Sequence, residues 1–494
     1  MRAAKFLTVA TAAVLCTAAR ADVAISNKPT SNMSCDAGVC TATAQKAVLN
    51  VGELAAMLAN GDVTLKTGSV AKDISIDQPI SWTSTSRLTL DARQSVIVNK
   101  QVTVMGQGNL TVTTNDNGQP KNKSGEFVVV REHGSVQLWD KNSSLIIDGQ
   151  SFTLVYDIKS FAADVAADPS GFYALAKPYD ASADGTFSWS PIPTAFKGHF
   201  DGLGNPVSNL TLAIMPSGEF FRAGLFSSLE KGGVVRNVRL SNAEAEGTSH
   251  PLAEIGLLVG TNEKGKIEYS SVSGTITING GSGEQVGGLA ADSDGTVRRS
   301  SAAVQITMTN ASGGVGGLLA VNAGSVTESS SSGSIVAKGE FSTPVGGLIG
   351  LNLTQGWVSD AFAVTAVHNG KDDRFNSENT FGGLVGENGG QIATSYAAGR
   401  IGAGHSADPD VPRGGLVGTD DASAGSLSNT YWNLDKGISD PTQGAGNISN
   451  DPGIIGLTDA QMKSGLPVGF DPRIWGSDPN VNNGYPYLIS NPPR

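Results

Sequence analysis

The sequence Phe381-Gly-Gly-Leu-Val-Gly-Glu-Asn388 decides the fold, because close copies of it recur through the second half of the chain. Six copies share one leucine, and successive leucines are separated by 31, 29, 30, 36 and 32 residues. These leucines are Leu258, Leu289, Leu318, Leu348, Leu384 and Leu416. Four residues after each of them lies a second shared position, occupied by Asn262, Ser293, Asn322, Asn352, Asn388 and Asp420. Such a period is typical of repeat proteins, in which each unit buries its apolar side against the next.

Each copy holds short strand-like segments separated by Gly, Asn and Ser turns, for example Thr275–Ile278 and Val304–Met308. Paired glycines allow tight turns and a close approach of neighbouring coils. We therefore expect an all-β fold, a right-handed parallel β-helix (β-solenoid) with one repeat per coil and short capping helices. The six leucines should stack as a repeat core, and the shared asparagines should form a ladder of side-chain amides. A β-sandwich with coincidental glycines is the alternative, which six copies of one pattern disfavour.

The composition excludes several classes of protein. The chain has 494 residues, of which 63 are glycine, and its charged residues make up 16%, against about a quarter in average proteins. These values exclude a charge-rich disordered chain and a coiled coil. A collagen is excluded because glycine does not occupy every third position. The net charge of −11, without a visible basic face, argues against nucleic-acid binding.

The first residues have the pattern of a secretory leader. Arg2 and Lys5 precede the apolar run Phe6–Leu15, and Ala19-Arg-Ala21 has the small residues of a signal-peptidase site. We predict a signal peptide over residues 1–21, cleaved between Ala21 and Asp22, which changes the net charge from −11 to −14. The run is too short to span a bilayer, so an N-terminal membrane anchor is the weaker alternative. Lipidation at Cys16 is another, which the large Leu15 before it disfavours.

The leader implies a secreted or cell-surface protein, with the periplasm as a second location, no membrane span and an outer-membrane export partner. In an oxidising compartment, Cys35 and Cys40 are expected to form a local disulfide that holds the N-terminal segment, residues 22–50. A metal site is the alternative for this pair. It would need two further ligands, and no histidine lies nearby in the sequence.

The remaining chain divides by its patterns. Residues 51–155 lack the repeat spacing, but apolar and polar residues alternate in short runs, as in Leu145-Ile-Ile-Asp-Gly149. They are expected to form an irregular β-helix. A helix over Val51–Asn60 is expected at its start. Residues 156–220 break the pattern and are expected to form a connecting insertion, with a short helix near Ser160–Ala167. Residues 221–432 form the repeat solenoid. Residues 433–494, with a capping box at Thr458–Gln461, are expected to form a C-terminal cap.

The repeat also resembles a known family. Gly-Gly-Leu-Val-Gly-x-Asn followed by Gly-x-Ile-x-x-Ser-Tyr, at residues 382–396, resembles the GLUG-motif repeats of bacterial surface and secreted proteins, including filamentous haemagglutinin-like adhesins. The resemblance covers residues 220 to 435 and implies an adhesin-like, extracellular β-helical stalk or surface that binds glycans, cell-surface or matrix molecules. The segments Gly198–Gly204 and Asn483–Tyr487 are similar to haemagglutinin-type chains as well. An Asn-Pro-Asn-Gly signature, expected of a two-partner secretion domain, is absent from the sequence.

The sequence contains none of the enzyme motifs that we sought, so no catalytic, cofactor-binding or metal-binding residue is predicted. His-Glu-x-x-His, Gly-x-Ser-x-Gly and the phosphate-binding loop are missing. Carboxylate pairs could serve a polysaccharide-cleaving β-helix, but each pair here lies beside Gly or Ser, where Asp favours turns. The pairs are Asp292 with Asp294, Asp372 with Asp373, and Asp420 with Asp421. We expect a non-enzymatic protein, with a carbohydrate-active β-helix enzyme as the alternative.

Two other groups of side chains could contribute to binding or chemistry. Aromatic residues of the repeats could form a patch that stacks on glycans, although packing between coils is the favoured interpretation. They are Trp357, Phe362, Tyr396, Tyr431 and Trp432. His199 and His368 are interpreted as surface or turn residues, and Gly404-His-Ser406 lacks the partner carboxylates of a pectin hydrolase.

Overall fold

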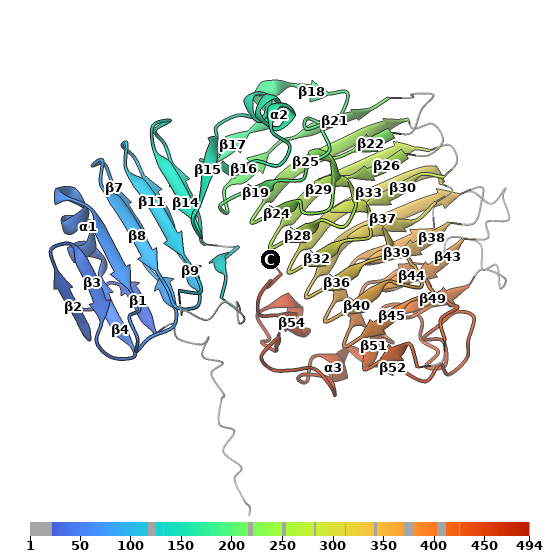
Figure 1. Ribbon diagram of the computed structural model, residues 1–494. Coiled ribbons are helices and arrows are strands. Elements are labelled where there is room, and N and C mark those ends of the chain that lie inside the picture. Colours follow the sequence, from blue (N-terminus) through green and yellow to red (C-terminus); the bar gives the residue numbers. More distant parts are fainter. Residues whose placement is uncertain are drawn as a thin grey trace, which may run out of the picture.

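The computed structural model describes residues 22–116, 125–131, 133–215, 221–248, 253–280, 283–311, 313–339, 343–369, 379–402, 412–423 and 425–493. The predicted signal peptide with Ala21, the pair Asp372 and Asp373, and the Gly404-His-Ser406 segment lie outside these residues. The described chain is nearly all β, with three short α-helices among its many strands. Most of its strands pair in parallel and form β-solenoid coils, and the repeat spacing predicts those of the second half (Figure 1).

An N-terminal solenoid is built from coils of three short strands. Their apolar residues alternate with polar ones, so that one side of each strand fills the core. The coils are β6 (Ile74–Ile76), β7 (Ile80–Trp82) and β8 (Arg87–Asp91); β9 (Val96–Val98), β10 (Val102–Val104) and β11 (Asn109–Thr113); and β12 (Phe127–Val129), β13 (Val136–Leu138) and β14 (Ser144–Ile147). Equivalent strands pair in parallel, for example Val102 with Val136.

A helix closes the N-terminal end of this solenoid. The elements before the first complete coil are β1 (Val23–Ser26), β2 (Met33–Asp36), β3 (Val39–Ala42), β4 (Ala47–Asn50), α1 (Val51–Asn60) and β5 (Val63–Lys66). The side chain of Asn50 accepts hydrogen bonds from the backbone N–H groups of Gly52 and Glu53, which fixes the start of α1. Leu54 and Leu58 on its inner side are fully buried against the core. Helix α1 therefore covers apolar residues that would otherwise face water.

The chain reverses its direction at Asp148 and Gly149. Both residues have positive φ angles, 49° and 80°, as in the two-residue type I′ turn that Asp-Gly favours. Strand β15 (Gln150–Val155) consequently pairs antiparallel with β14. The strands that follow, β16 (Phe172–Leu175) and β19 (His199–Asp201), pair in parallel again and continue the same sheet. One sheet of sixteen strands thus joins the two solenoids.

Residues 156–220 provide the start of the second core. Helix α2 (Ile158–Ala167) buries Ile158, Phe161 and Val165, and the Phe161 ring stacks on Phe200 with 4.7 Å between centroids. The short strands of this region are β17 (Tyr179–Asp180), β18 (Thr186–Phe187), β20 (Pro206–Ser208) and β21 (Thr211–Ile214), with a 3-10 turn at Ala181–Asp184. Helix α2 lies over the first coil of the repeat solenoid (Figure 1).

Each coil of the repeat solenoid contributes to four parallel sheets. The first contains β22 (Phe221–Ala223), β26 (Ala253–Gly256), β30 (Gln285–Gly287), β34 (Val315–Gly316), β38 (Pro344–Gly346), β43 (Thr380–Gly382) and β48 (Arg413–Gly414). The second contains β23 (Phe226–Leu229), β27 (Val259–Asn262), β31 (Ala290–Ser293), β35 (Leu319–Asn322), β39 (Ile349–Asn352), β44 (Val385–Asn388) and β49 (Val417–Asp420).

The third sheet continues the one from the N-terminal solenoid. Its strands are β24 (Val234–Arg236), β28 (Lys266–Glu268), β32 (Thr296–Arg298), β36 (Ser325–Thr327), β40 (Trp357–Ser359), β45 (Gln391–Ala393) and β50 (Leu427–Ser428). The fourth contains β25 (Arg239–Thr248), β29 (Ser271–Asn279), β33 (Ser301–Ala311), β37 (Ser330–Gly339), β41 (Phe362–Ala363), β42 (Ala366–Asn369), β46 (Tyr396–Ala397), β47 (Ile401–Gly402), β51 (Thr430–Asn433) and β52 (Ile454–Leu457).

The repeat positions stack from coil to coil. All six shared leucines are fully buried, and their backbones are joined in sequence, with the N–H of Leu348 donating to the carbonyl oxygen of Leu384 at 2.8 Å. Beside them runs a ladder of side-chain hydrogen bonds. Asn262 donates to Ser293 at 2.9 Å, Asn322 to Asn352 at 2.8 Å, Asn352 to Asn388 at 2.7 Å, and Asn388 to Asp420 at 2.7 Å. The ladder satisfies buried polar groups and fixes the register between coils.

The repeat glycines keep the coils close together. A Cβ atom placed on Gly382 would lie only 1.8 Å from the carbonyl oxygen of Val385 in the same coil and 2.7 Å from the backbone nitrogen of Gly418 in the next coil. No side chain fits at that position without moving the backbone of the next strand, which explains the repetition of the glycine pair.

The C-terminal cap, residues 433–493, covers the last coil and one side of the solenoid. The backbone N–H groups of Leu416 and Val417 donate to the carbonyl oxygen of Gly444 at 2.9 and 3.1 Å, so the final strand edge is paired. Helix α3 (Asp459–Met462) begins with the capping box between Thr458 and Gln461. The chain then returns across the fourth sheet, where β53 (Trp475–Gly476) and β54 (Tyr487–Leu488) form a hairpin, with a 3-10 turn at Asn482–Gly484 (Figure 1).

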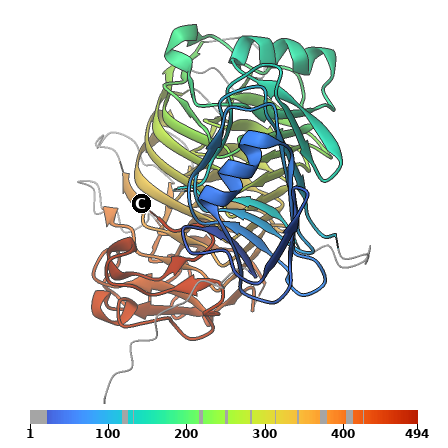
Figure 2. The same ribbon diagram turned by 90° about the vertical axis from the view of Figure 1, so that its left-hand side faces the viewer.

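The two solenoids lie side by side and contact each other through charged groups (Figures 1 and 2). Glu126 of the N-terminal solenoid accepts hydrogen bonds from Tyr269, Arg298 and Arg299 of the repeats. Burial raises the pKa of Glu126, but these hydrogen bonds and positive charges hold it below its usual value. The carboxylate therefore stays ionised at neutral pH. We call this contact the junction.

None of the described helices is long and apolar enough to cross a membrane.

Candidate binding site

Cys35 and Cys40 face each other on the first two strands of the sixteen-stranded sheet. They are bonded to each other, with an S–S distance of 2.05 Å, across the hairpin of β2 and β3. Cys40 is fully buried, and β3 pairs with β5, so the disulfide lies at the outer start of the sixteen-stranded sheet. The bond holds the N-terminal hairpin and brings no other reactive group with it.

The acidic pairs occupy different environments. Asp294 accepts a hydrogen bond from the backbone N–H of Lys264 at 2.6 Å, which is a turn contact between coils. Asp292 lies on β31, where burial first and Asp294 next raise its pKa. Asp420 ends the amide ladder, and Asp421 beside it is exposed. No group of three or more His, Cys, Asp or Glu side chains that could hold a metal ion exists among the described residues.

His199 lies in a small cavity of about 190 Å³ where the chain reverses. It is half-buried, and its ring packs on Phe172 with 4.7 Å between centroids. Burial, followed by the charge of Arg236, lowers the pKa of His199. Asp201 nearby is buried and is held by Asn237 and Arg236. The charge of Asp201 is balanced by Arg236, and Asn237 donates to both oxygens of its carboxylate, so we interpret the cluster as structural.

The aromatic residues of the repeats do not form an open patch. Phe362, Tyr396 and Tyr431 occupy one column of the fourth sheet, and the first two stack with 5.1 Å between centroids and 3° between planes. Phe470 and Trp475 of the cap cover this column. All three column residues are buried, as is Trp432, whereas Trp357 on β40 is 42% exposed. Packing explains the buried rings, and a glycan cannot reach them while the cap is in place.

The outer face of β25, β29, β33 and β37, here called the broad face, carries exposed polar side chains in register. Thr275, Gln305 and Ser334 form one row across the strands, and Thr277 pairs with Thr307 in the next. The Thr and Gln side chains of both rows are exposed. Neighbouring strands repeat at about 4.8 Å, so the face offers hydroxyl and amide groups at a regular spacing.

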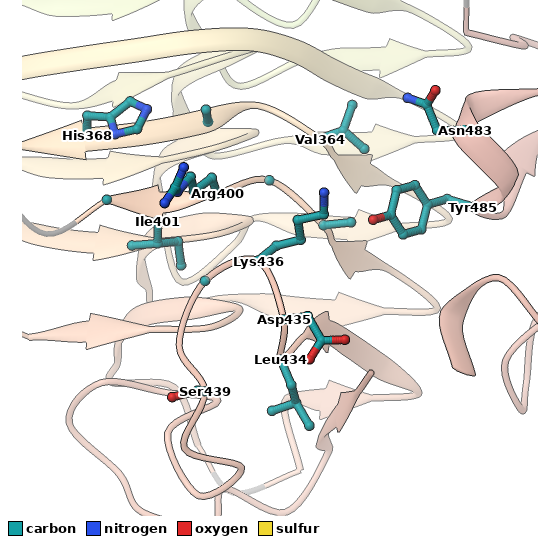
Figure 3. Close-up of a pocket in the computed structure, with 15 residues that line it drawn as sticks. Val364, His368, Arg400, Ile401, Leu434, Asp435, Lys436, Ser439, Asn483 and Tyr485 are labelled. Atoms are coloured by element: carbon teal, nitrogen blue, oxygen red, sulfur yellow. The ribbon is translucent and has the colours of Figure 1, made fainter. Parts of the chain in front are cut away.

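One row of the broad face leads into a cleft. Thr307 pairs with Val336, Val336 with His368 and His368 with Gly402. His368 lines a cleft of about 1110 Å³ between the fourth sheet and the cap (Figure 3). A Cβ atom on Gly402 would lie 2.2 Å from Nδ1 of His368, so the glycine leaves room for the imidazole ring.

Nitrogen-bearing side chains from three elements line this cleft, and two of them, Arg400 and Lys436, are cations. His368 lies on β42, Arg400 precedes β47, and Lys436 follows β51. Figure 3 shows these three around the cleft, with Tyr485 of the cap at one end. Arg400 and Lys436 are exposed and form no ion pair within the part of the chain that the structure describes.

The acidic groups near the cleft already have partners. Oδ2 of Asp435 accepts the backbone N–H of Asp459 at 2.7 Å. Tyr485 donates its hydroxyl to Asp459, and burial together with that carboxylate raises the pKa of Tyr485. The hydroxyl therefore stays protonated at neutral pH. Asp459 in turn binds Lys463 at 2.7 Å. The cleft can hold a hydroxyl-rich molecule with a negative charge, but it lacks a nucleophile activated by a neighbouring base.

Sequence reasoning did not find this cleft. Arg400, Lys436 and Tyr485 lie outside the repeated positions, and 85 residues separate the first from the last in the sequence. Only the return of the cap across the fourth sheet brings them together. His368 was interpreted as a surface residue, and no local pattern connects it with the other three.

Comparisons with known proteins identify the motif and one distant relative. A family model described as "The GLUG motif" matches residues 253–277, which include β26 to β28 and part of β29. Halomucin from Haloquadratum walsbyi is 27% identical over 248 residues, 45% of this chain, and the match spans 2% of halomucin's length.

Among solved structures, that of a candidate immunoglobulin A1 protease from Bacteroides ovatus has a TM-score of 0.41 and 18% identity, with 69% of this chain and 93% of that chain covered. The polar face, the cleft and the amide ladder belong to a parallel β-solenoid, and residues 253–277 of it match the GLUG motif.

Proposed function

We propose that this protein is a secreted or surface-associated, adhesin-like β-solenoid that binds glycans or other molecules of cell surfaces and matrices without cleaving them. The observation that carries this proposal is the broad face. Its exposed threonine and glutamine side chains are in register on the longest strands of the repeats.

The chemistry of the broad face suits sugars. Hydroxyl and amide groups both donate and accept hydrogen bonds, and short side chains lose little conformational entropy when they are fixed. Each contact is weak in water, but contacts repeated along one polymer add to a useful affinity. The parallel strands hold the rows rigidly, which reduces the cost of binding further.

The comparisons support the location rather than the ligand. The GLUG match and the likeness to halomucin suggest an extracellular or surface protein. The predicted signal peptide agrees with that location. A haemagglutinin-like adhesive role is our extension of the motif resemblance.

The test is a binding assay with a panel of oligosaccharides and matrix proteins. Thr307→Glu places a bulky charge at the centre of the broad face and should weaken glycan binding at least about tenfold, the effect of losing about 1.4 kcal/mol. Thr89→Glu, on β8 of the N-terminal solenoid, is the matched control and should bind as wild type. Equal affinities for the two variants would place the binding surface elsewhere.

A second candidate is a carbohydrate-active enzyme. Glu254, on β26 of the first sheet, lies close enough to Asp292, on β31 of the second sheet, for the two charges to interact, and burial raises the pKa of both. Glycoside hydrolysis uses two carboxyl groups, one of which is a general acid whose pKa is raised. Glu254, however, also receives Arg222 Nε at 3.0 Å and the hydroxyl of Thr261, which is typical of a structural ion pair.

The assay for this candidate is the release of reducing ends or unsaturated products from pectic, algal and chitin-type polysaccharides. We expect none from wild type. Turnover that disappears in both Glu254→Gln and Asp292→Asn would establish the enzyme instead.

A further inference from the structure

The cleft at the end of the broad face has a charge opposite to that of the whole chain. The protein carries a net charge of −11, yet the cationic side chains of Arg400 and Lys436 line one cleft from two separate elements, with the imidazole ring of His368 beside them. Like charges that converge repel one another, and they raise the local concentration of an oppositely charged ligand. This arrangement suits a cleft that receives an anion.

Among the described residues, no carboxylate forms an ion pair with Arg400 or Lys436. The carboxylate of Asp435, which also lines the cleft, accepts the backbone N–H of Asp459. Asp459 binds Lys463 and Tyr485 instead of Arg400 or Lys436. Within the described residues, Arg400 and Lys436 therefore keep their donors available for a ligand.

The size and walls of the cleft fit a ligand larger than a single ion. Its volume of about 1110 Å³ lies near the upper end of typical ligand pockets, which hold roughly 300 to 1000 Å³. Gly399, Gly402 and Gly437 line it and leave the backbone accessible. The row that starts at Thr277 reaches His368 in three strand steps, a distance of about 15 Å at about 4.8 Å per step. A polymer on the broad face can thus continue into the cleft.

We propose that this cleft binds the acidic groups, carboxylate or sulfate, of a polysaccharide whose hydroxyl groups contact the broad face. The inference rests on the proposed function and narrows it to acidic glycans. Arg400 pairs with a planar carboxylate or a sulfate through two N–H donors, Lys436 adds a single charge, and His368 donates from its ring. The phenolic oxygen of Tyr485 lies at one end of the cleft (Figure 3).

The experiment measures the affinity of the full mature chain by calorimetry at low and high salt. The probes are a uronic-acid hexasaccharide, its carboxyl-reduced neutral counterpart and its sulfated counterpart. Arg400→Gln and Lys436→Gln remove charges from the cleft, and Lys231→Gln removes an exposed lysine elsewhere as the matched control. A separate titration with inorganic sulfate follows the His368 ring resonance by nuclear magnetic resonance.

We expect the acidic hexasaccharides to bind at least about tenfold more tightly than the neutral one, with an affinity that falls as salt screens the charges. Each cleft variant should lower that affinity several-fold and weaken its salt dependence, while neutral binding and the Lys231→Gln control stay unchanged. A preference for the sulfated over the uronic-acid probe, or the reverse, identifies which acidic group the cleft selects.

Two results would overturn the inference. One is equal affinity for acidic and neutral probes. The other is cleft variants that behave like Lys231→Gln. The titration with inorganic sulfate distinguishes failure of the anion-site inference from failure of the proposed glycan binding. If no oligosaccharide binds but sulfate shifts His368 in wild type and not in Arg400→Gln, the broad-face proposal fails and the anion site stands. If neither binds, both are wrong.

Discussion

Asp420 at the end of the amide ladder gives a sharp test of how the repeats are held together. Asn388 donates to the carboxylate oxygen Oδ1 of Asp420 at 2.7 Å. In the two ladder contacts between asparagines, the acceptor is an amide oxygen instead. Burial first, and the neighbouring Asp451 after it, raise the pKa of Asp420 to about 6, against the hydrogen bond that Asn388 donates. The substitution Asp420→Asn keeps the acceptor for Asn388 and gives Asp451 a donor instead of a second carboxylate.

The magnitude follows from the pKa. A rise from 3.8 to about 6 corresponds to about 3 kcal/mol at about 1.36 kcal/mol for each pKa unit. Solvent beyond the last coil screens part of the Asp420 charge. We therefore expect Asp420→Asn to raise the free energy of unfolding by about 1 to 2 kcal/mol at neutral pH. Because the folded state binds this proton more tightly, the wild-type contribution is most favourable below about pH 4 and is lost as the pH rises to about 6.

The assay compares denaturant midpoints of wild type, Asp420→Asn and Asp421→Asn near pH 4 and near pH 7.5. The difference between Asp420→Asn and wild type should be large near pH 7.5 and vanish near pH 4, whereas the exposed Asp421→Asn should follow wild type at both. Taking the difference between each variant and wild type at the same pH cancels the contributions of the other titrating groups to stability. A variant no more stable than wild type near pH 7.5, or a gain that is the same at both pH values, would refute the reasoning.

Three further outcomes are expected. Leu348→Asp buries an unpaired carboxylate in the stacked core and should lower the unfolding free energy by more than about 4 kcal/mol. Thr354→Asp, at an exposed position, should shift the denaturant midpoint little. Equal midpoints for the two variants would contradict the stacking. Cys35 and Cys40 should resist alkylation without reductant in exported protein, and two alkylated thiols by intact mass would exclude the bond. Glu126→Gln removes the negative charge that holds the two solenoids together at the junction. Limited proteolysis between the solenoids should therefore become faster, and an unchanged cleavage rate would disprove this role of Glu126.

The sequence predicts those features that repeat. One leucine and one asparagine in every coil indicate stacking, because a unit of this size cannot bury its own apolar side. Helix α1 and the capping box at Thr458 were also predictable, since the signals lie within a few residues. The reversal after β14 was not predicted from the sequence, although Asp148-Gly149 is a strong hairpin signal. The alternating strand pattern of Leu145–Gly149 was interpreted as a continuation of the β-helix instead.

The candidate site depended on contacts that no local pattern contains. The aromatic column is hidden by Phe470 and Trp475, which come from a segment without repeats. The cleft likewise needs Lys436 and Tyr485 from the cap beside His368 from the sheet. Only the path of the cap in three dimensions decides which side chains remain available to a ligand.

The contact between Arg131 and Asn491 has a mechanical consequence. Arg131 of the N-terminal solenoid donates to the side chain of Asn491, 360 residues later in the sequence, and Ser490 beside it donates to Glu328 at 2.7 Å. Tension applied to the two ends of the chain would pass through this bridge and leave the coils between them unloaded. The bridge would break first, by a few hydrogen bonds, and only then would the coils begin to unwind one after another. A protein anchored on a cell in flowing water would thus lengthen in steps under load.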